Sequence, residues 1–290
     1  MKKLKIAVPK GSLQEATINL FNNAGFEIYG STRSYYLSID DPEIEAILIR
    51  AQEIPRYVEL GVFDAGISGR DWITENRAKV KEVCELTYSK QGLRPVKIVL
   101  AAPENSNIRS VKDLKGKIIA TELVNLTKDY LKKNNVDCDV EFSWGATEIK
   151  AGNLVDAIVE ITETGSTLKS NGLKIIDIIM ESSPRFIANN HSWKDEWKKE
   201  KIENISLLFL GALNAAKKVG LKMNATKKDV DKIIKALPAI KKPTVSTLAE
   251  EGWFAIDTII DKKDAKTLIP KIKKLGASGI VEYTLNKVIY

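Results

Sequence analysis

Short apolar runs alternate with amphipathic stretches over residues 1–180. This alternation is typical of α/β units built around parallel sheets. It predicts strands at residues 5–8, 45–49, 62–67, 96–101, 117–121, 140–143, 155–161 and 174–179, with helices between most of them, for example at 126–133 and 192–203. After the first strand, Ser12 and Glu15 have the spacing of a helix-capping pair, and Gly25 fits the end of that helix.

Residues 218–289 follow a different order of elements. The pattern predicts strands at 218–223, 244–249, 253–260 and 279–289, and helices at 227–237 and 264–275. The order βαββαβ is that of the ferredoxin-like arrangement. The tail is therefore expected to form an independent small domain of a type that binds small ligands or other subunits.

The bulk composition indicates a globular protein. Of 290 residues, 44% are hydrophobic and 29% are charged, which argues against disorder. No apolar run reaches the roughly 18 residues of a membrane helix, and the N-terminal stretch lacks the features of a signal peptide, so we expect a cytoplasmic protein.

Two cysteines and one histidine are too few for a zinc site. The net charge of +7 favours anionic partners, but the lysines are scattered and charge alone decides nothing.

The most informative segment is Asp156–Leu168, which reads Asp-Ala-Ile-Val-Glu-Ile-Thr-Glu-Thr-Gly-Ser-Thr-Leu. It predicts a buried strand that carries Glu160 near its end, then a turn that opens a helix. Backbone N–H groups and hydroxyls in such a turn can hold a phosphate monoester, and Gly165 permits a close approach of the backbone. Glu160 is placed to accept hydrogen bonds from ribose hydroxyls. The turn taken by itself also fits a simple helix cap.

The sequence around this segment, residues 145–173, resembles the signature of ATP phosphoribosyltransferases, in which such a loop binds phosphoribosyl pyrophosphate. Further segments match that family in order: residues 7–13, 50–58, 64–71, 120–122 with 126–127, 185–189, 243–246, 252–253 and 276–277. The last three resemble the regulatory domain of the long form, so the resemblance covers essentially the whole chain. One departure touches the chemistry, because Glu160 stands where the family usually has Asp.

The resemblance implies a fold as well as an activity. We expect an α/β protein with a two-lobed, periplasmic-binding-protein-like catalytic region and a C-terminal ferredoxin-like βαββαβ domain. Residues 1–92 with 183–203 would form lobe I, residues 93–182 would form lobe II with the phosphoribosyl pyrophosphate loop, and residues 204–290 would form the regulatory domain.

The implied reaction transfers the 5-phosphoribosyl group of phosphoribosyl pyrophosphate to N1 of ATP with release of pyrophosphate. It is the first step of histidine biosynthesis, catalysed by a glycosyltransferase with Mg²⁺ as cofactor and histidine as feedback inhibitor. The resemblance also implies a homo-oligomer, from dimer to homohexamer, and no nucleic-acid or membrane partner.

The resemblance and the motif together predict site residues. The catalytic candidates are Glu160 for the ribose hydroxyls and Lys10 and Arg50 for phosphate charge. The substrate-binding candidates are Thr164, Gly165, Ser166, Thr167 and Leu168 around the 5-phosphate, together with Gly11, Asp71 and Glu122. The candidates for the histidine pocket are Ser246, Thr247, Ala277 and Ser278. The sequence does not identify the ligands of Mg²⁺.

Two other classes of protein remain open at this stage. The first is a cytoplasmic two-lobed binding protein for a phosphorylated metabolite, because the catalytic region of this family resembles the lobes of periplasmic binding proteins. The second is a transcription regulator with such lobes as its effector domain, which would need a helix-turn-helix module. Turnover of ATP and phosphoribosyl pyrophosphate would separate the enzyme from both.

Overall fold

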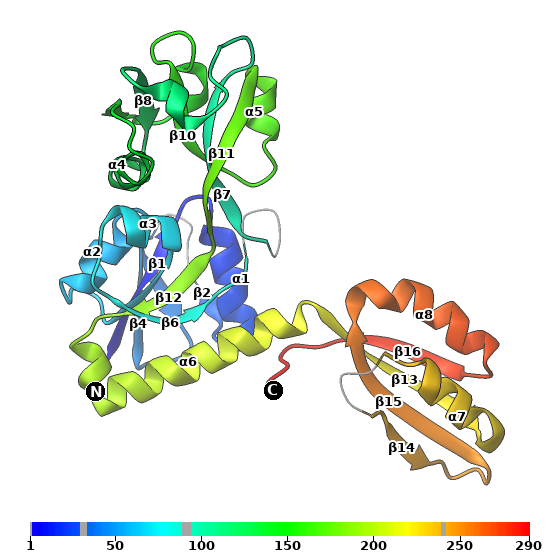
Figure 1. Ribbon diagram of the computed structural model, residues 1–290. Coiled ribbons are helices and arrows are strands. Elements are labelled where there is room, and N and C mark those ends of the chain that lie inside the picture. Colours follow the sequence, from blue (N-terminus) through cyan, green and yellow to red (C-terminus); the bar gives the residue numbers. More distant parts are fainter. Residues whose placement is uncertain (1, 30–33, 89–93, 239–241) are drawn as a thin grey trace. The chain divides into compact units, whose positions relative to one another are not determined.

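The computed structural model describes residues 2–29, 34–88, 94–238 and 242–290. The chain divides into two compact units, the first comprising Met1–Asn22 and Phe26–Ser206 and the second Asn23–Gly25 and Leu207–Tyr290 (Figure 1). The first unit contains a seven-stranded and a five-stranded sheet. We call the part built on the seven-stranded sheet lobe I and the part built on the five-stranded sheet lobe II.

Lobe I has the strand order β2-β3-β4-β1-β5-β12-β6. The strands are β1 (Leu4–Lys10), β2 (Ile28–Tyr29), β3 (Tyr36–Ile39), β4 (Ile44–Arg50), β5 (Ala65–Gly69), β6 (Lys81–Glu85) and β12 (Pro184–Ala188), and the helices are α1 (Gln14–Ala24), α2 (Ile54–Glu59) and α3 (Arg70–Glu75). β1 pairs in parallel with β4 and β5. Because β1 and β5 are buried on both faces, they are almost continuously apolar.

Lobe II has the strand order β11-β7-β10-β8-β9. Its elements are β7 (Val96–Pro103), β8 (Ile118–Thr121), α4 (Val124–Lys133), β9 (Asp139–Phe142), β10 (Ala157–Thr162), α5 (Ser166–Ser170) and β11 (Leu173–Ser182). Alternate residues of the central strands enter two core clusters, one on each face of the sheet: Val159 packs with Leu126 and Leu131, whereas Ile158 packs with Leu168.

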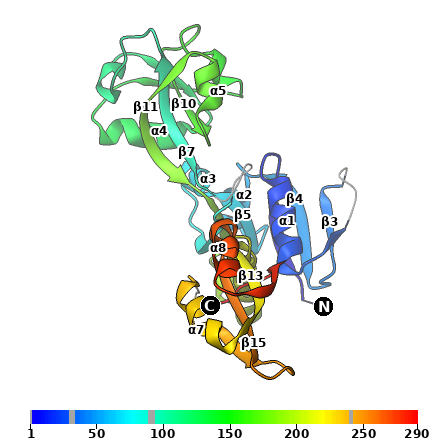
Figure 2. The same cartoon turned by 90° about the vertical axis from the view of Figure 1, so that its right-hand side faces the viewer.

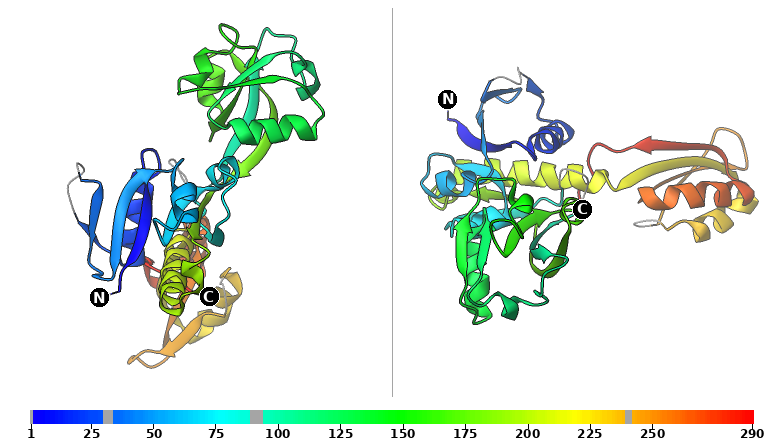
Figure 3. Two further views of the ribbon diagram at one scale, coloured as in Figure 1. Left: turned by 90° about the vertical axis from the view of Figure 1, so that its left-hand side faces the viewer. Right: turned by 90° about the horizontal axis from the view of Figure 1, so that it is seen from above.

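The two lobes are connected through neighbouring strands. β11 pairs with β7 in lobe II and ends at Ser182, and β12 begins at Pro184 and pairs with β5 and β6 in lobe I. Figures 2 and 3 show the green strands of lobe II as a sheet separate from the blue strands of lobe I. The expected two-lobed, periplasmic-binding-protein-like α/β architecture is confirmed.

The second unit is a four-stranded antiparallel sheet with two helices on one face. Its elements are β13 (Lys218–Thr226), α7 (Lys227–Ala236), β14 (Thr244–Thr247), β15 (Trp253–Asp261), α8 (Lys262–Lys274) and β16 (Ser278–Thr284). The strand order β14-β15-β13-β16 and the core around Leu221, Ile233, Ile256 and Ile272 confirm the expected βαββαβ domain. Helix α6 (Glu196–Ala215) contributes residues to both units. In the described part of the chain, no helix combines the length and the apolar character needed to cross a bilayer.

Several local expectations need correction. The sheets are mixed rather than wholly parallel, because β7 is antiparallel to β10 and β11, and β12 is antiparallel to β5. β2, β3, β6 and β12 were not expected from the sequence. Helix α1 begins at Gln14, two residues after Ser12, and the Gln14 side chain accepts a 3.5 Å hydrogen bond from the Gly11 N–H. The helix expected over 192–203 is a 3₁₀ turn at Ser192–Lys194 followed by the longer α6.

Gly220 of β13 lies against the ring of Tyr283. A Cβ at this position would lie 2.1 Å from the nearest ring atom, so Gly220→Ala is expected to overpack the second unit and destabilise it by about 1–3 kcal/mol, measured by denaturant unfolding of the full chain. Combining it with Tyr283→Ala removes the clash, so the double variant should be less destabilised than the sum of the two single variants. If the losses of stability in the two single variants simply add up in the double variant, this packing is contradicted.

Candidate active site

The carboxyl ends of the parallel strands of lobe I meet at one edge of the sheet. The pairing of β1 with β4 continues to Lys10 and Arg50, which are direct register partners, and β5 ends at Gly69. Ligands of open α/β sheets bind at the carboxyl ends of the strands. The pairing therefore places two cationic residues side by side at the edge where a site is expected.

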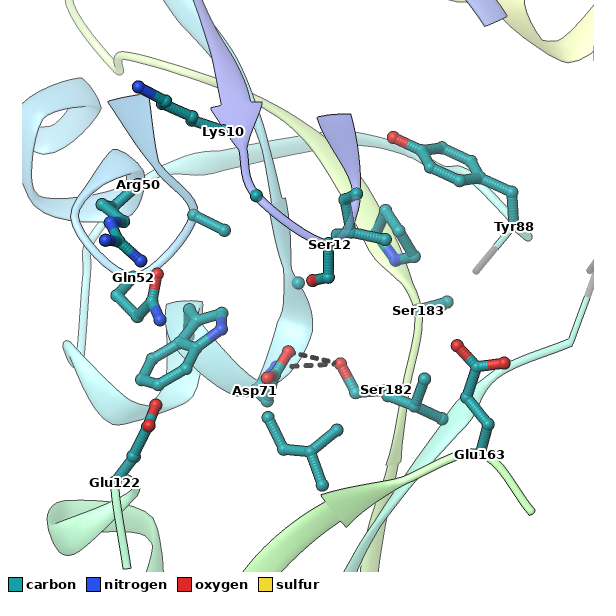
Figure 4. A pocket seen from close by; sticks show the side chains of 18 residues that line it. Lys10, Ser12, Arg50, Gln52, Asp71, Tyr88, Glu122, Glu163, Ser182 and Ser183 are labelled. Carbon is teal, nitrogen blue, oxygen red and sulfur yellow. Dashed lines mark hydrogen bonds between the residues drawn. The ribbon is translucent and has the colours of Figure 1, made fainter. Parts of the chain in front are cut away.

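A cavity of about 380 Å³ lies at this edge, within the first unit. Lobe I contributes Lys10, Gly11, Ser12, Leu13, Arg50, Ala51, Gln52, Gly69, Asp71, Trp72 and Tyr88; the connecting strands contribute Val96, Ser182, Ser183 and Pro184; lobe II contributes Glu122, Ile161 and Glu163. Figure 4 shows Lys10 and Arg50 at the upper left of the cavity, Glu122 below them and Glu163 at the lower right. The structure thus brings together Lys10, Gly11, Arg50, Asp71 and Glu122 from the predicted set.

Lys10 and Arg50 are available to an anionic ligand. In the described part of the chain, neither forms an ion pair with a carboxylate. The Lys10 Nζ lies 3.8 Å from the centre of the Tyr35 ring, and the hydrogen bond and charge of Lys10 lower the pKa of the Tyr35 hydroxyl. Their positive charge is therefore not balanced by a carboxylate of the described chain.

Asp71 is the most buried carboxylate of the cavity, with 4% of its surface exposed. Its Oδ1 accepts a 2.7 Å hydrogen bond from the Ser182 hydroxyl, whose oxygen in turn accepts one of 3.0 Å from the Asp71 N–H. A Cβ on Gly69 would lie 2.0 Å from this carboxylate oxygen, so any other residue at position 69 would displace the Asp71 carboxylate. Burial raises the pKa of Asp71, although the Ser182 hydroxyl and backbone N–H groups oppose the shift. Asp71 therefore links the start of α3 to the strand that leaves lobe II.

The predicted phosphate turn lies at the carboxyl end of β10. Thr164, Ser166 and Thr167 are exposed, and Gly165 has a φ of +78° that favours glycine. The Thr164 and Ser166 hydroxyl oxygens are 2.9 Å apart, and the Gly165 N–H donates to Thr162 Oγ1 at 2.9 Å. These four residues do not belong to the lining of the cavity described above.

Leu168 differs from the rest of the turn. Only 1% of its surface is exposed, and its side chain packs in a core cluster of lobe II. Leu168 is among the predicted substrate-binding residues, and its side chain anchors the turn to the sheet.

Glu160 is half-buried on β10. It lies on the same face of the strand as Ile158, and therefore on the face that α5 covers. One of its carboxylate oxygens accepts a 2.9 Å hydrogen bond from the Ile161 N–H, and Thr147 donates a second. Burial raises the pKa of Glu160, and the nearby charges of Glu148 and Glu122 raise it further, whereas the two hydrogen bonds lower it.

The four candidates for a histidine pocket are not brought together. Ser246 and Thr247 lie exposed on β14, at one edge of the four-stranded sheet, and Ser278 begins β16 at the other edge. Ser246 and Ser278 share one row across the sheet, through register pairs at Ala255 and Asn224, which separates them by about three strand spacings, roughly 14 Å. Ala277 is 2% exposed and belongs to the core, so its side chain is not available to a ligand.

The described residues contain no group of three or more His, Cys, Asp or Glu side chains arranged to hold a metal ion. Mg²⁺ usually keeps several waters and binds through one or two carboxylates together with substrate phosphates. Glu122 and Glu163, both half-buried in the cavity wall, fit that smaller contribution.

Sequence reasoning missed Gln52, Trp72, Tyr88, Glu163 and Ser182 as cavity residues. Trp72 directly follows Asp71, so the matched segment pointed towards it. Ser182 had no comparable signal, because its partner Asp71 is 111 positions away along the chain. Only the crossing of strands between the lobes brings the two together.

Comparisons with known proteins agree with one another. Residues 50–209 match the family model described as ATP phosphoribosyltransferase, and residues 215–287 match the HisG C-terminal domain. The chain is 58% identical over 286 residues to the ATP phosphoribosyltransferase of Pelodictyon phaeoclathratiforme, with 99% of this chain and 97% of the relative covered. It is 54% identical to that of Solibacter usitatus, with 99% of each chain covered. The ATP phosphoribosyl transferase (HisG:HisZ) complex from Thermotoga maritima superposes on 71% of this chain and 98% of its own, with a TM-score of 0.61 and 27% identity.

Burial disfavours the charged form of Asp71, so its pKa is higher in the folded state than in the unfolded state. The free energy of unfolding therefore falls as the pH rises between these two pKa values. Asp71→Asn is therefore expected to unfold at a higher temperature than the wild type at pH 8, with the difference shrinking towards pH 4; thermal unfolding across this range measures it. The control is Asp64→Asn, which is also buried but is paired with Lys198 at 2.6 Å and should lose stability. A pH-independent effect of Asp71→Asn would show that its charge is not the cause.

Proposed function

The chain belongs to the ATP phosphoribosyltransferase family, in the long form with a C-terminal regulatory domain, and on that premise we propose that the cavity at the carboxyl ends of β1, β4 and β5 is its active site. The enzyme catalyses the first step of histidine biosynthesis. We retain the functional division in which residues 1–92 with 183–203 and residues 93–182 are the two catalytic lobes and residues 204–290 are regulatory. The observation that carries the proposal is the pair Lys10 and Arg50 at a strand-end cavity, neither of them paired with a carboxylate in the part of the chain that the structure describes.

In the proposed reaction, the lone pair on N1 of the adenine of ATP attacks the anomeric carbon of phosphoribosyl pyrophosphate. A C–N bond forms, the C–O bond to pyrophosphate breaks, and pyrophosphate leaves with the bonding electrons. The ring nitrogen is already a nucleophile, so alignment of the two anionic substrates is the main task of the protein. Such alignment contributes at most about 7–11 kcal/mol.

The charges of the cavity suit these substrates. Lys10 and Arg50 would balance the phosphate charge of ATP or pyrophosphate, while lobe II contributes Glu122 and Glu163. Bound Mg²⁺ would neutralise charge on the leaving pyrophosphate. The ion would be held mainly by substrate phosphates, and Glu122 and Glu163 are the cavity carboxylates that would complete its coordination.

The exposed turn at residues 164–167 would hold the 5-phosphate of the ribose. Its hydroxyls and its glycine at positive φ supply donors without a blocking side chain. Glu160 lies on the face of β10 that is covered by α5, the helix that follows the turn. Its carboxylate would accept hydrogen bonds from the ribose hydroxyls and stabilise the positive charge that develops on the sugar during displacement. Burial is the main cause of its raised pKa, and the charges of Glu148 and Glu122, which raise that pKa further, also make the position favourable for a cation.

Substitutions in the turn test this assignment. Thr167→Ala removes a hydrogen bond to a charged phosphate, so we expect the KM for phosphoribosyl pyrophosphate to rise about 10–100-fold. Glu160→Ala should mainly lower kcat, because it removes a charge that acts on the developing cation. Both are measured by steady-state release of pyrophosphate.

The matched control is Ser170→Ala, whose hydroxyl donates to the Thr167 carbonyl at 2.9 Å on the same short helix. It should leave both constants close to wild type. Wild-type kinetics in Thr167→Ala and Glu160→Ala would remove the turn from the mechanism, and absence of turnover in the wild-type chain would overturn the proposed function itself.

Histidine would act as feedback inhibitor through the second unit, coupled through contacts in a homo-oligomer of two to six chains. Because Ser246 and Thr247 lie on the opposite edge of the sheet from Ser278, one pocket within a single copy cannot include both edges. The exposed hydroxyls of β14 are the more accessible pair, and we assign the inhibitor to them.

Ser246→Ala and Thr247→Ala each remove one hydroxyl hydrogen bond. Each is expected to raise the histidine concentration for half-inhibition about 3–10-fold, with turnover in the absence of histidine unchanged. Inhibition assays at a fixed substrate concentration measure this. Thr267→Ala on α8, whose hydroxyl donates to the Asp264 carbonyl, is the control and should be neutral. If the β14 variants are inhibited normally and Ser278→Ala needs a higher histidine concentration for half-inhibition, the pocket lies at the other edge of the sheet.

A further inference from the structure

Helix α4 of lobe II begins directly behind the cavity wall. Glu122, which lines the cavity, is followed by Leu123 at the N-cap and by the first residue of the helix, Val124. The Leu123 side chain cannot accept a hydrogen bond, so the N-cap residue supplies no side-chain cap for the N–H groups of the first turn, which have no partner within the helix. These donors need a partner from elsewhere.

That partner is Glu75, the last residue of α3 in lobe I. Its two carboxylate oxygens accept hydrogen bonds from the Asn125 N–H at 3.0 Å and the Leu126 N–H at 2.9 Å, across about 50 positions of sequence. The Asn125 side chain returns a 3.0 Å hydrogen bond to the Glu75 carbonyl. A carboxylate at this position satisfies two unpaired donors and interacts favourably with the helix dipole.

The rest of α3 strengthens the same contact. Trp72 lines the cavity and also packs against the core cluster of lobe II. Arg77, just after α3, forms a 2.9 Å ion pair with Asp129 of α4. The Asn76 side chain donates a 2.8 Å hydrogen bond to the carbonyl of Gln52, another cavity residue. One short helix thus joins both walls of the cavity.

We infer that Glu75 is a positioning residue for the transfer reaction: by capping α4 from the opposite lobe, it holds the Glu122 wall against the Lys10–Arg50 wall. The inference rests on the proposed function of the cavity. The connecting strands alone leave the lobes joined on one side, and the Glu75 cap adds a second attachment that must break before the walls separate at α4.

The role predicts a particular kinetic signature. Without the cap, a smaller fraction of molecules has both walls in place, and the apparent affinity for each ligand that needs both walls falls by that fraction. A helix cap of this kind corresponds to about a 3–30-fold change in population. Loss of Glu75 should therefore raise the KM for ATP and for phosphoribosyl pyrophosphate by one common factor when each is measured with the other substrate well below saturation. With both substrates saturating, kcat should stay within about twofold of the wild type. A residue that touches one substrate would change the KM of that substrate alone.

The experiment compares Glu75→Ala and Glu75→Gln with the wild-type full chain. Steady-state kinetics give both KM values, and hydrogen exchange of the Asn125 and Leu126 amides reports on the cap directly. We expect a common KM increase of about 3–30-fold in Glu75→Ala, a smaller one in Glu75→Gln, and faster amide exchange that saturating substrates slow again. If Glu75→Ala does not fold, Glu75→Gln, which keeps an acceptor of similar shape, carries the same comparison.

Two controls separate the role from helix stability. Glu59→Gln makes the same chemical change in a carboxylate that bonds within lobe I, to the Lys79 N–H at 3.0 Å, and should leave both KM values unchanged. Adding Val124→Asp to Glu75→Ala restores a negative charge at the start of α4 without restoring the link to lobe I. The KM increase should persist in that double variant.

Several results would overturn the inference: unchanged KM values in the Glu75 variants, a change for one substrate only, unchanged amide exchange, or recovery of normal KM values in the double variant. Failure of the proposed function is distinguishable, because the wild-type chain would then release no pyrophosphate, whereas amide exchange at Asn125 and Leu126 would still report on the cap.

Discussion

The parallel pairing of β1 with β4 and β5 is the constraint on which the site depends. It brings Lys10 and Arg50, forty positions apart, into direct register at one edge of a sheet. Parallel strands run in one direction, so their carboxyl ends must share an edge, and the residues that follow them form a common surface. If the pairing of β1 and β4 shifted by one residue, the side chains of β4 would change faces and the two cations would separate.

The second requirement is a wall opposite these cations. It comes from lobe II, which reaches lobe I through β11 and β12 on one side and through α3 and α4 on the other. The Asp71–Ser182 pair lies on the first route and the Glu75–α4 contact on the second. Both use a carboxylate of lobe I, but Asp71 is buried with a hydroxyl and backbone N–H groups as its partners, whereas Glu75 meets the positive end of a helix. The first contact carries an electrostatic cost that grows with pH, and the second is favoured by charge.

Sequence patterns predicted the parts of this fold that are decided locally. The strands at 5–8 and 45–49 and the βαββαβ tail follow from apolar runs and turns that each span a few residues, and the structure contains them. Edge strands such as β2 and β6 are short and partly exposed, so they carry little apolar signal. The mixed direction of the sheets was also out of reach, because it depends on the return of the chain from lobe II, not on any local pattern.

The same distinction applies to the site. Lys10 and Arg50 end their strands and Asp71 lies two residues beyond the end of β5, all within segments that match the family, so they could be identified one by one. Leu168 shows the limit of this approach: it belongs to the matched turn, yet its apolar side chain packs in the core. Ser246 and Ser278 show another, since residues that resemble the same regulatory domain lie on opposite edges of one sheet. Contacts between distant segments, such as Ser182 with Asp71 or Glu75 with Leu126, leave no trace in either partner's local sequence.

The distribution of charge across the cavity connects the fold to the chemistry. Lobe I supplies Lys10 and Arg50, and lobe II supplies Glu122 and Glu163. Displacement at an anomeric carbon moves negative charge onto the departing pyrophosphate, so the cationic wall, and a Mg²⁺ held beside the acidic wall, would neutralise it from two sides. That complementarity acts only while the walls face each other at a fixed separation. A helix joined to both lobes therefore has a function beyond stability, because it preserves the alignment on which the electrostatic effect depends.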